Sequence, residues 1–433
     1  MSSPPPRQGA FAHYHDDLLR RFGAEAAALR HELFFLRRHA DGWPAVARAA
    51  AAWLRDTGLL LRRGQSAAAP ASDAAQAILV CSLAGASGWQ TLARSLDACR
   101  DAGLPAVILA HPRLRADELP SELPRLAPAR PRGADLINSL RAFSAARRRR
   151  WPLLLALGAG RLALWRACLA RSLSGRRGVL LLHNDFDLLS QAAQSQGLAA
   201  ICLQHGLPSD EFFPARADWH VLWGESSRRL FLAAGCAPAR LLVDALGRGQ
   251  GRLAEAPPQR IALLSQTHAG VFGPGLGQRL RELVSEFAAR GVALEVLLHP
   301  QEQAAAAYPA LPNIRLRQAP HRLLRDDRDG TCLVLGYCST AMLDAALAGH
   351  WVAALDFAEP GNAGARSLLA SPLRVANAEQ AQALLQRLGA DAAFRADTRR
   401  AMQAWLDEVF ATPSGALLGL LRGYRESTPG GTR

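Results

Sequence analysis

The sequence lacks lysine altogether and has few aromatic side chains, although it is 433 residues long. All 51 basic side chains are therefore arginines, and they exceed the 37 acidic side chains to give a formal net charge of +14. Such a surplus favours a polyanion, an anionic membrane surface or phosphorylated substrates as partners. Aromatic residues make up only 6% of the chain, and no nucleic-acid recognition motif is present, so we expect no nucleic-acid partner.

Cysteine occurs at only seven positions, scattered along the chain. No two of them form a Cys-x-x-Cys pair and several lie inside apolar runs, which argues against zinc binding and against a disulfide framework. Histidine, aspartate and glutamate show no spacing typical of a metal site either. We therefore expect a reducing compartment, no metal and no cofactor. The seven positions are Cys81, Cys99, Cys168, Cys202, Cys236, Cys332 and Cys338.

The sequence has neither an apolar signal core near its N-terminus nor an uninterrupted membrane span. Its longest apolar stretch, residues 151–170, is broken by Pro152, Arg161 and Arg166. It falls short of the roughly 20 clean apolar residues of a spanning helix, so we interpret it as a pair of buried helices. The neighbouring run Arg147–Arg150 leaves contact with a membrane surface open. We expect a cytoplasmic protein, with attachment to the inner face of the cytoplasmic membrane as an open possibility.

Three common motifs of nucleotide and ester chemistry are missing. There is no G-x-x-x-x-G-K-[ST] loop and no G-x-S-x-G elbow, and the glycine-rich turn at residues 85–88 lacks the third glycine of a dinucleotide fingerprint. The segment HNDFD at residues 183–187 offers two carboxylates at metal-dependent-transferase spacing. That signal is weak, because the rest of the chain indicates two sheets.

What the chain does contain is a repeated alternation of short apolar runs with helical patterns, typical of parallel α/β sheets. Two helical segments, about 11–40 and 43–63, come first. One alternating set follows and a second comes after a stretch rich in glycine and proline, which we interpret as a hinge. The expected divisions are an N-terminal helical segment with its linker (1–76), a first sheet domain (77–250), a second sheet domain (260–405), and a C-terminal helix and tail (406–433).

Polar residues follow many of the expected strands. In open α/β sheets, ligands bind beyond the carboxyl ends of the strands, so these residues are candidates for a binding site. In the first set they are Ser82, Asp185, Asp187, Gln204, His205 and Asp210. In the second set they are Ser265, Gln266, Thr267, His268, His299, Ser339, Thr340 and Asp356.

The stretch at residues 336–349 predicts a strand end, a turn and a helix capped by Ser339 or Thr340. A helix start carries free N–H groups and partial positive charge, which suit a phosphate. The alternative is an ordinary capped helix. His299, held in extended geometry by Pro300, follows another strand of the same set and can donate to a phosphate or ribose oxygen. The alternative for His299 is a bond to a carbonyl.

Three residues of the first set are candidates for a general base. His205 stands between Gln204 and Gly206 at the end of an apolar strand, where the glycine permits a tight turn. Asp185 and Asp187 follow a second strand. Either aspartate could instead cap the helix that begins near residue 188.

Four segments give the chain a family resemblance: ICLQHGLPSD, WGESSRRLFLAAG, LLHPQE and GYCSTAMLDAALAG, between residues 201 and 349. With them the chain resembles bacterial GT-B glycosyltransferases of capsule and lipopolysaccharide assembly, in particular the sialyltransferase-like and Kdo-transferase-like groups. More distantly it resembles the polyglycerol-phosphate transferases. It departs from relatives at Cys338, where many have serine, and at Gly247-Arg248-Gly249, which lacks their proline.

The resemblance implies a GT-B fold, in which two Rossmann-like domains face each other across a cleft, here with an added N-terminal helical segment. It implies metal-independent transfer from a nucleotide-sugar donor, a CMP-sugar in preference to UDP or GDP, to a surface-polysaccharide or lipid-linked saccharide acceptor. The base would be Asp185, Asp187 or His205, with an acidic base slightly preferred. The implied donor-binding residues are His299, Pro300, Ser339, Thr340, Gln266, Thr267 and Gly336, and the acceptor-side residues are Gln204, Gly206 and Asp210.

Two other functions remain as alternatives. A sugar-nucleotide epimerase or hydrolase of the same architecture would turn over its nucleotide sugar without an acceptor. A non-catalytic polyanion-binding protein would use the net charge of +14 alone.

Overall fold

The computed structural model describes residues 10–38, 42–64, 74–83, 85, 88–248, 251, 253–266, 275–299, 302, 308, 310–318, 330–357 and 367–426. Thr267, His268 and Pro300, named above, lie outside these ranges.

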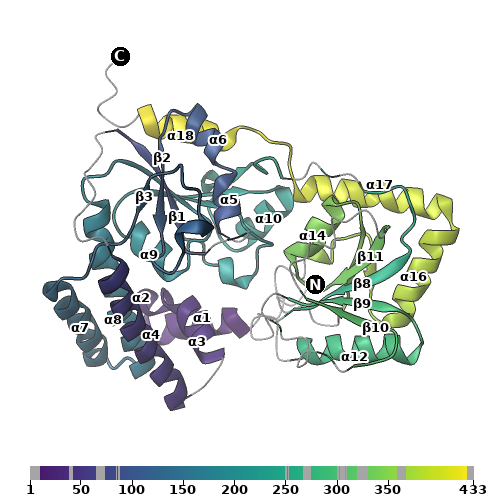
Figure 1. The fold of residues 1–433 in the computed structure, drawn as a ribbon, viewed down its shortest axis with the longest axis horizontal. Coiled ribbons are helices and arrows are strands. Elements are labelled where there is room, and N and C mark those ends of the chain that lie inside the picture. The colour runs from purple at the N-terminus through teal and green to yellow at the C-terminus, as the bar shows by residue number, and fades with distance from the viewer. Residues whose placement is uncertain are drawn as a thin grey trace, which may run out of the picture.

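Two parallel sheets form the centre of the molecule (Figure 1). The first has seven strands in the order β3-β2-β1-β4-β5-β6-β7. The second has six, in the order β10-β9-β8-β11-β12-β13. Counted within its own sheet, each contains the doubly wound order 3-2-1-4-5-6, to which the first sheet adds a seventh strand. The order in which strands are added reverses between the first and fourth strands. The expected α/β fold with two Rossmann-like domains is confirmed.

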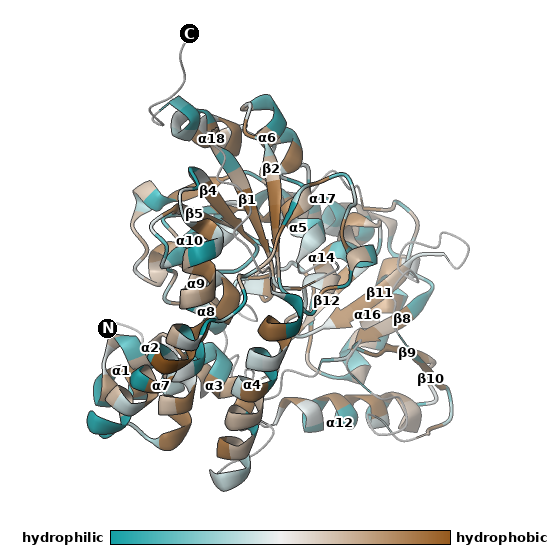
Figure 2. Ribbon diagram, turned by 60° about the vertical axis from the view of Figure 1, so that its left-hand side comes forward, coloured by the Kyte–Doolittle hydropathy of each residue, from teal (hydrophilic) through white to brown (hydrophobic). Residues whose placement is uncertain are grey.

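The strands are short and mostly apolar. Those of the first sheet are β1 (Gln76–Cys81), β2 (Ala106–Ala110), β3 (Arg125–Leu126), β4 (Gly178–Leu182), β5 (Ala199–Leu203), β6 (Trp219–Leu222) and β7 (Leu241–Val243). Those of the second are β8 (Arg260–Leu264), β9 (Leu294–Leu297), β10 (Ile314–Arg317), β11 (Cys332–Gly336), β12 (Trp351–Leu355) and β13 (Arg374–Val375). The central strands are apolar because helices cover both faces of a parallel sheet, and Figure 2 shows them in brown.

Helices surround both sheets. The first sheet is followed or flanked by α5 (Trp89–Ala93), α6 (Leu96–Asp101), α7 (Gly133–Arg148), α8 (Leu153–Leu173), α9 (Leu188–Gln194) and α10 (Glu225–Ala233), with short 3₁₀ turns η1 (Ala116–Glu118), η2 (Asp210–Phe212) and η3 (Pro238–Arg240). The second carries α12 (Leu276–Ala289), α14 (Thr340–Leu347), α16 (Ala378–Ala390) and α17 (Ala392–Val409).

The N-terminal helical segment consists of α1 (Ala10–Phe22), α2 (Ala24–Ala27), α3 (Arg30–Arg38) and α4 (Gly42–Arg63). The single helix expected over 11–40 is wrong. It breaks at Gly23, whose φ of +84° lies in the left-handed region, and α3 starts again at Arg30. The break turns α3 so that it contacts both α1 and α4.

Helix α8 is the one described helix that is long and apolar enough to cross a membrane, and 61% of its most apolar window is buried inside the protein. It packs against α7 and α4. Its Arg161 pairs with Asp56 of α4 at 2.7 Å and also with Glu32 of α3. A buried arginine bound in this way requires acidic partners from neighbouring helices, which fits an interior position.

The C-terminal helix α18 (Ala416–Glu426) returns to the first sheet. Leu417 and Leu421 are fully buried in the same apolar cluster as Ala77, Leu79 and Val179. Figure 1 shows α18 beside α6, and α17 at the upper right next to the second sheet. The chain therefore crosses between the two sheet domains twice.

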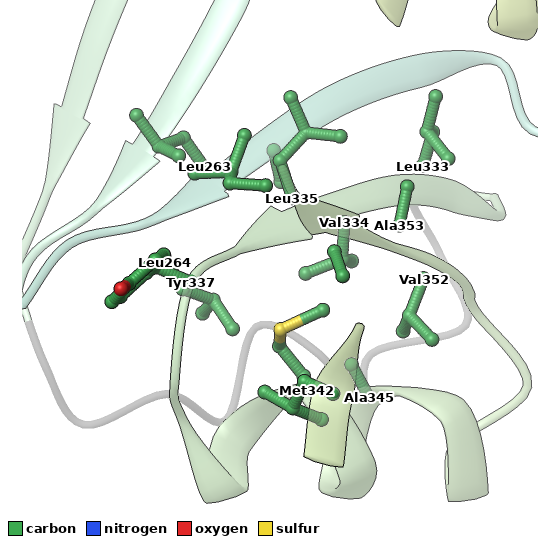
Figure 3. Packing of buried hydrophobic residues seen from close by; sticks show 14 of the residues in the cluster. Leu263, Leu264, Leu333, Val334, Leu335, Tyr337, Met342, Ala345, Val352 and Ala353 are labelled. Atoms are coloured by element: carbon green, nitrogen blue, oxygen red, sulfur yellow. The ribbon is translucent and has the colours of Figure 1, made fainter. Parts of the chain in front are cut away.

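The core of the second domain fixes the position of α14. Figure 3 shows Met342 of α14 directed at the strands of this sheet. A Cβ atom added at Gly336 would lie 2.6 Å from Sδ of Met342 and 2.8 Å from its Cγ. Gly336, expected as a donor-binding residue, thus has a steric role: it lets α14 pack closely on the end of β11.

Candidate active site

The order of strand addition in the first sheet reverses between the parallel neighbours β1 and β4. Polar side chains link the carboxyl ends of these two strands. The Ser82 hydroxyl donates to Asp187 Oδ2 at 2.5 Å and lies 3.2 Å from Nε2 of His183. Asn184 Nδ2 donates to the same Asp187 oxygen at 2.8 Å. These bonds join two strands that are neighbours in the sheet but about a hundred residues apart in the chain.

Asp187 is the N-cap of α9, because its Oδ1 accepts from the Ser190 N–H at 2.7 Å. Burial acts to raise the pKa of Asp187, but the nearby His183 and the bonds from Ser82, Ser190 and Asn184 outweigh it and hold the pKa below its ordinary value. The capping alternative thus describes its geometry, and a carboxylate stabilised in its charged form is a weak base.

Asp185 is also engaged with the backbone. Its Oδ2 accepts from the N–H groups of Arg216, at 2.5 Å, and Ala217, at 3.0 Å. Asp185 is 3% exposed, and its Oδ2 lies 3.8 Å from Nε2 of His220. These contacts hold the loop that precedes β6, so Asp185 fastens two strand connections together.

His205 lies in the loop after β5, in an aromatic environment. Its ring stacks on Phe212 with 5.1 Å between centroids, and the rings of His183 and Phe186 are 5.9 Å and 6.4 Å away. Burial, with a smaller contribution from His183, lowers the pKa of His205 to about 4. Its Nδ1 has no hydrogen-bond partner within the described part of the chain. His205 is therefore neutral near pH 7.

Gln204 uses its whole amide to shape the same loop. Its Nε2 donates to the Gly206 carbonyl and to the Ser227 hydroxyl, both at 2.9 Å. Its Oε1 accepts from the Trp223 N–H at 2.8 Å. These three hydrogen bonds of Gln204 thus hold the His205–Gly206 turn in place.

The second sheet has an equivalent link between β8 and β11, where its order of strand addition reverses. Gln266, after β8, accepts from the Cys338 N–H at 3.1 Å and donates to the Cys338 carbonyl. Ser339 then caps α14, with its hydroxyl accepting from the Ala341 N–H at 3.2 Å. Gln266 therefore positions the turn from which α14 begins.

His299 directly follows β9, which pairs with β8. Its backbone N–H donates to Glu302 Oε2 at 2.8 Å, and its side chain is half-buried. Three neighbouring strands, β9, β8 and β11, thus bring His299, Gln266 and Ser339 to the same edge of the sheet. Thr267 and Pro300, the other donor-side candidates, lie outside the described residues.

The two domains meet at these two edges. The N–H of Leu207 donates to Thr340 Oγ1 at 3.1 Å. A Cβ atom added at Gly206 would lie 3.2 Å from the same oxygen. The His205–Gly206 loop of the first domain therefore rests on the first turn of α14 in the second, and Gly206 permits this close approach.

One pair beside the loop after β5 was not anticipated from the sequence. Glu211 of η2 lies with its Oε2 3.6 Å from Nε2 of His31 in α3, and their side chains are 17% and 21% exposed. The His31 ring packs 4.4 Å from that of Phe186. Burial chiefly raises the pKa of Cys338, and the acidic charges of Glu211 and Asp210 add to this effect. No local pattern signals a pair separated by about 180 residues.

The described residues contain no group of three or more His, Cys, Asp or Glu side chains able to hold a metal ion. Within these ranges, the polar groups at the junction are carboxylates, hydroxyls, amides and imidazoles. Such groups can bind an anion, orient a hydroxyl and accept a proton.

No protein-family model matches the sequence, and no curated protein matches it. Solved structures similar in fold include CalG4, the calicheamicin glycosyltransferase, with 16% identity over 82% of this chain and 99% of that one, at a TM-score of 0.40. The structure of Os79 from O. sativa in complex with UDP has 12% sequence identity over 81% of this chain and 100% of that chain, at a TM-score of 0.46. A trehalose-6-phosphate structure from E. coli bound with UDP-2-fluoro glucose has 14% sequence identity over 81% of this chain and 97% of that chain, at a TM-score of 0.46.

Proposed function

We propose that this chain is a glycosyltransferase that moves a sugar from a nucleotide-sugar donor to a hydroxyl of a surface-polysaccharide or lipid-linked saccharide acceptor, without a metal. The observation that carries the proposal is the contact of Leu207 with Thr340. It brings the carboxyl edge of the second sheet, where the nucleotide-sugar donor is expected to bind, against the carboxyl edge of the first sheet. A reaction between two substrates needs such a junction.

The donor nucleotide would bind at the second sheet. The start of α14 supplies partial positive charge for a phosphate. Thr340 Oγ1 already accepts from Leu207, so the hydroxyl proton remains to be donated to a phosphate oxygen. His299 lies at the same edge of the sheet and would donate a second hydrogen bond to the phosphate. These groups, without an ion, would stabilise the departing nucleotide. We favour a CMP-sugar, on the His-Pro and Ser/Thr segments, over UDP or GDP.

The acceptor would approach the first sheet beside the loop formed by Gln204 and Gly206, with Asp210 at its end. The proposal includes peripheral contact with the inner face of the cytoplasmic membrane, where a lipid-linked acceptor would lie. The support for this contact is helix α4, which exposes Trp43 and Leu54 at 76% and 74% among arginines.

Nucleotide binding is the direct test. Calorimetry with CMP, CDP, UDP and GDP should show micromolar affinity for one of them. His299→Ala and Thr340→Val should each weaken that affinity about tenfold, because each removes one hydrogen bond to a charged phosphate, about 1.5 kcal/mol. His13→Ala, a change at an exposed histidine of α1, should leave it unchanged. Equal affinity in all four proteins would overturn the assigned donor site.

Turnover separates the proposed transferase from the alternatives. A labelled nucleotide sugar should be consumed rapidly only when acceptor is added, and consumption should persist in excess EDTA. Rapid consumption without acceptor would instead support an epimerase or hydrolase. Failure of every nucleotide to bind, together with salt-sensitive binding of polyanions, would support a non-catalytic protein.

A further inference from the structure

Glu302 makes hydrogen bonds at the ends of three neighbouring strands of the second sheet. Its Oε2 accepts from the His299 N–H at 2.8 Å, two residues after β9. Its Oε1 accepts from the Ser265 hydroxyl at 2.8 Å, directly after β8. Its carbonyl accepts from Gln318 Nε2 at 2.9 Å, directly after β10. One residue therefore joins the carboxyl ends of β10, β9 and β8, which are neighbours in the sheet.

Both backbone groups of His299 are bonded to this one residue. The His299 N–H donates to the Glu302 carboxylate, and the Glu302 N–H donates to the His299 carbonyl at 2.8 Å. With its backbone fixed in this way, the place of the imidazole depends on the rotations of its own side chain alone. Glu302 therefore sets the point from which the imidazole of His299 extends.

Two buried hydroxyl groups hold the Glu302 carboxylate in turn. Ser265 and Tyr308 are 5% and 6% exposed, and their hydroxyl oxygens lie 2.8 Å apart. The single hydroxyl proton of Ser265 is donated to the carboxylate, which only accepts, so Tyr308 is the donor to Ser265. Burial is the main cause that raises the pKa of Tyr308 to about 12, so its hydroxyl keeps this proton near pH 7.

This network lies where strand pairing no longer holds the chain. The register of β8 with β9 ends at Leu264 and Leu297. Residues beyond the last pair need other partners for their backbone groups, and the Glu302 carboxylate is such a partner for the His299 N–H. The bonds of Glu302 thus order the edge of the sheet at which the donor phosphate is proposed to bind.

We infer that Glu302 is a positioning residue of the donor site, which holds His299 where its imidazole meets the phosphate of the nucleotide. This inference rests on the glycosyl transfer proposed above. A histidine that is ordered before the nucleotide arrives loses less freedom on binding, so more of its hydrogen bond appears as affinity. Glu302 acts through His299 and makes no contact with the nucleotide itself.

A double-mutant cycle of nucleotide binding measures this dependence. Calorimetry is done on the full-length protein with the tightest-binding nucleotide among CMP, CDP, UDP and GDP. Glu302→Gln keeps the side-chain shape but leaves only one accepting oxygen, so it should weaken binding about threefold to tenfold, at most as much as His299→Ala. In the His299→Ala background the same change should weaken binding less than about twofold, because the group that Glu302 positions is absent.

Two further measurements separate positioning from a general loosening of the site. In a Thr340→Val background, Glu302→Gln should weaken binding by the same factor as in the wild type, because independent sites contribute additively. A general loosening would weaken binding in the His299→Ala background too. Glu282→Gln changes an exposed glutamate of α12 that accepts from Gln278. It is the matched control and should bind the nucleotide as the wild type does.

Ser265→Ala provides a second variant should Glu302→Gln fail to fold. It removes the bond to Glu302 Oε1 and leaves the bond from the His299 N–H to Oε2 in place. Nucleotide binding should weaken about twofold to threefold, and this effect should disappear in the His299→Ala background. An effect of equal size in both backgrounds would contradict the positioning role.

Failure of this role and failure of the proposed function give different results. If His299→Ala weakens nucleotide binding but Glu302→Gln does not, or does so equally with and without His299, Glu302 has no positioning role. If His299→Ala binds the nucleotide as tightly as the wild type, His299 is not a donor-site residue and the role of Glu302 falls with it. If the wild type binds no nucleotide and transfers no sugar, the proposed function itself is wrong.

Discussion

At the scale of single residues, buried ionisable groups show what the fold does to side-chain chemistry. His205 and His111 both have a pKa lowered to about 4, chiefly by burial. All the described cysteines with altered acidity, such as Cys81 and Cys99, have a raised pKa for the same reason. Burial disfavours whichever form carries charge, so these imidazoles stay neutral and these thiols stay protonated.

The two histidines predict a loss of stability in acid. Their folded pKa of about 4 lies below the unfolded value of about 6.5, so the unfolded chain binds more protons between these limits. Their contribution is complete above about pH 6.5 and is lost as the pH falls towards 4. The free energy of unfolding should decrease by about 2–3 kcal/mol per histidine between about pH 7 and pH 4.5.

Urea denaturation at the two pH values measures this loss. His111→Gln should reduce the drop in unfolding free energy on acidification, whatever its effect at pH 7. His13→Gln should not, because His13 is exposed. An identical drop in His111→Gln and wild type would contradict the role given to His111.

At the scale of elements, α4 combines a buried face with an unusual outer face. On the inside, Asp56 accepts from Arg161 Nε and from the Trp165 indole, at 2.7 Å and 2.8 Å. On the outside, Trp43, Leu54 and Leu61 are 76%, 74% and 45% exposed and recur at helical spacing. Arg48, Arg55 and Arg62 are exposed beside them. An apolar stripe bordered by arginines matches an anionic bilayer surface.

Helix α4 should therefore bind anionic vesicles. In sedimentation with vesicles containing about 30% phosphatidylglycerol, Leu54→Glu with Leu61→Glu should weaken partitioning more than tenfold, since two apolar contacts are lost and two negative charges gained. Ala396→Glu with Ala401→Glu, both at exposed positions of α17, places the same two charges on the other domain and serves as control. Equal binding by all proteins would exclude α4 as the contact, and concentration-dependent self-association lost in the variant would indicate a dimer face instead.

At the scale of the whole molecule, the two domains are joined by more than their hinge. Arg248 lies with its guanidinium 4.1 Å from the Trp223 ring centroid and pairs with Asp344 of α14. The Ala411 N–H donates to the Trp223 carbonyl at 2.8 Å, where the chain leaves α17 for α18. The return of α18 thus makes the first domain depend on the far end of the sequence.

Loss of this packing should destabilise the first domain. Leu417→Ala with Leu421→Ala removes two fully buried side chains, at about 2–4 kcal/mol each. Urea unfolding followed by tryptophan fluorescence should show the loss, and Arg422→Ala at an exposed position of α18 is the control. If the double variant unfolds as the wild type does, α18 is only an appendage.

Local sequence patterns were enough to predict most of the strands and helices, since the causes of these elements are local. Continuous apolar runs predicted β4, β5 and β11, because a parallel strand is covered on both faces. The predicted cap residue Ser339 begins α14, because its hydroxyl reaches an N–H only two residues away. The broken helix near Gly23 shows the limit of helical periodicity, which continues across a turn without revealing it.

Which polar residues meet one another depends on the folded arrangement of the chain and not on local pattern. Asp185 meets the backbone of Arg216 and Ala217, Leu207 meets Thr340, and Glu211 meets His31. The last two pairs join segments more than a hundred residues apart. Hydrogen bonding and desolvation set the reactivity of a carboxylate or an imidazole, and both depend on neighbours that the fold brings together from distant parts of the chain.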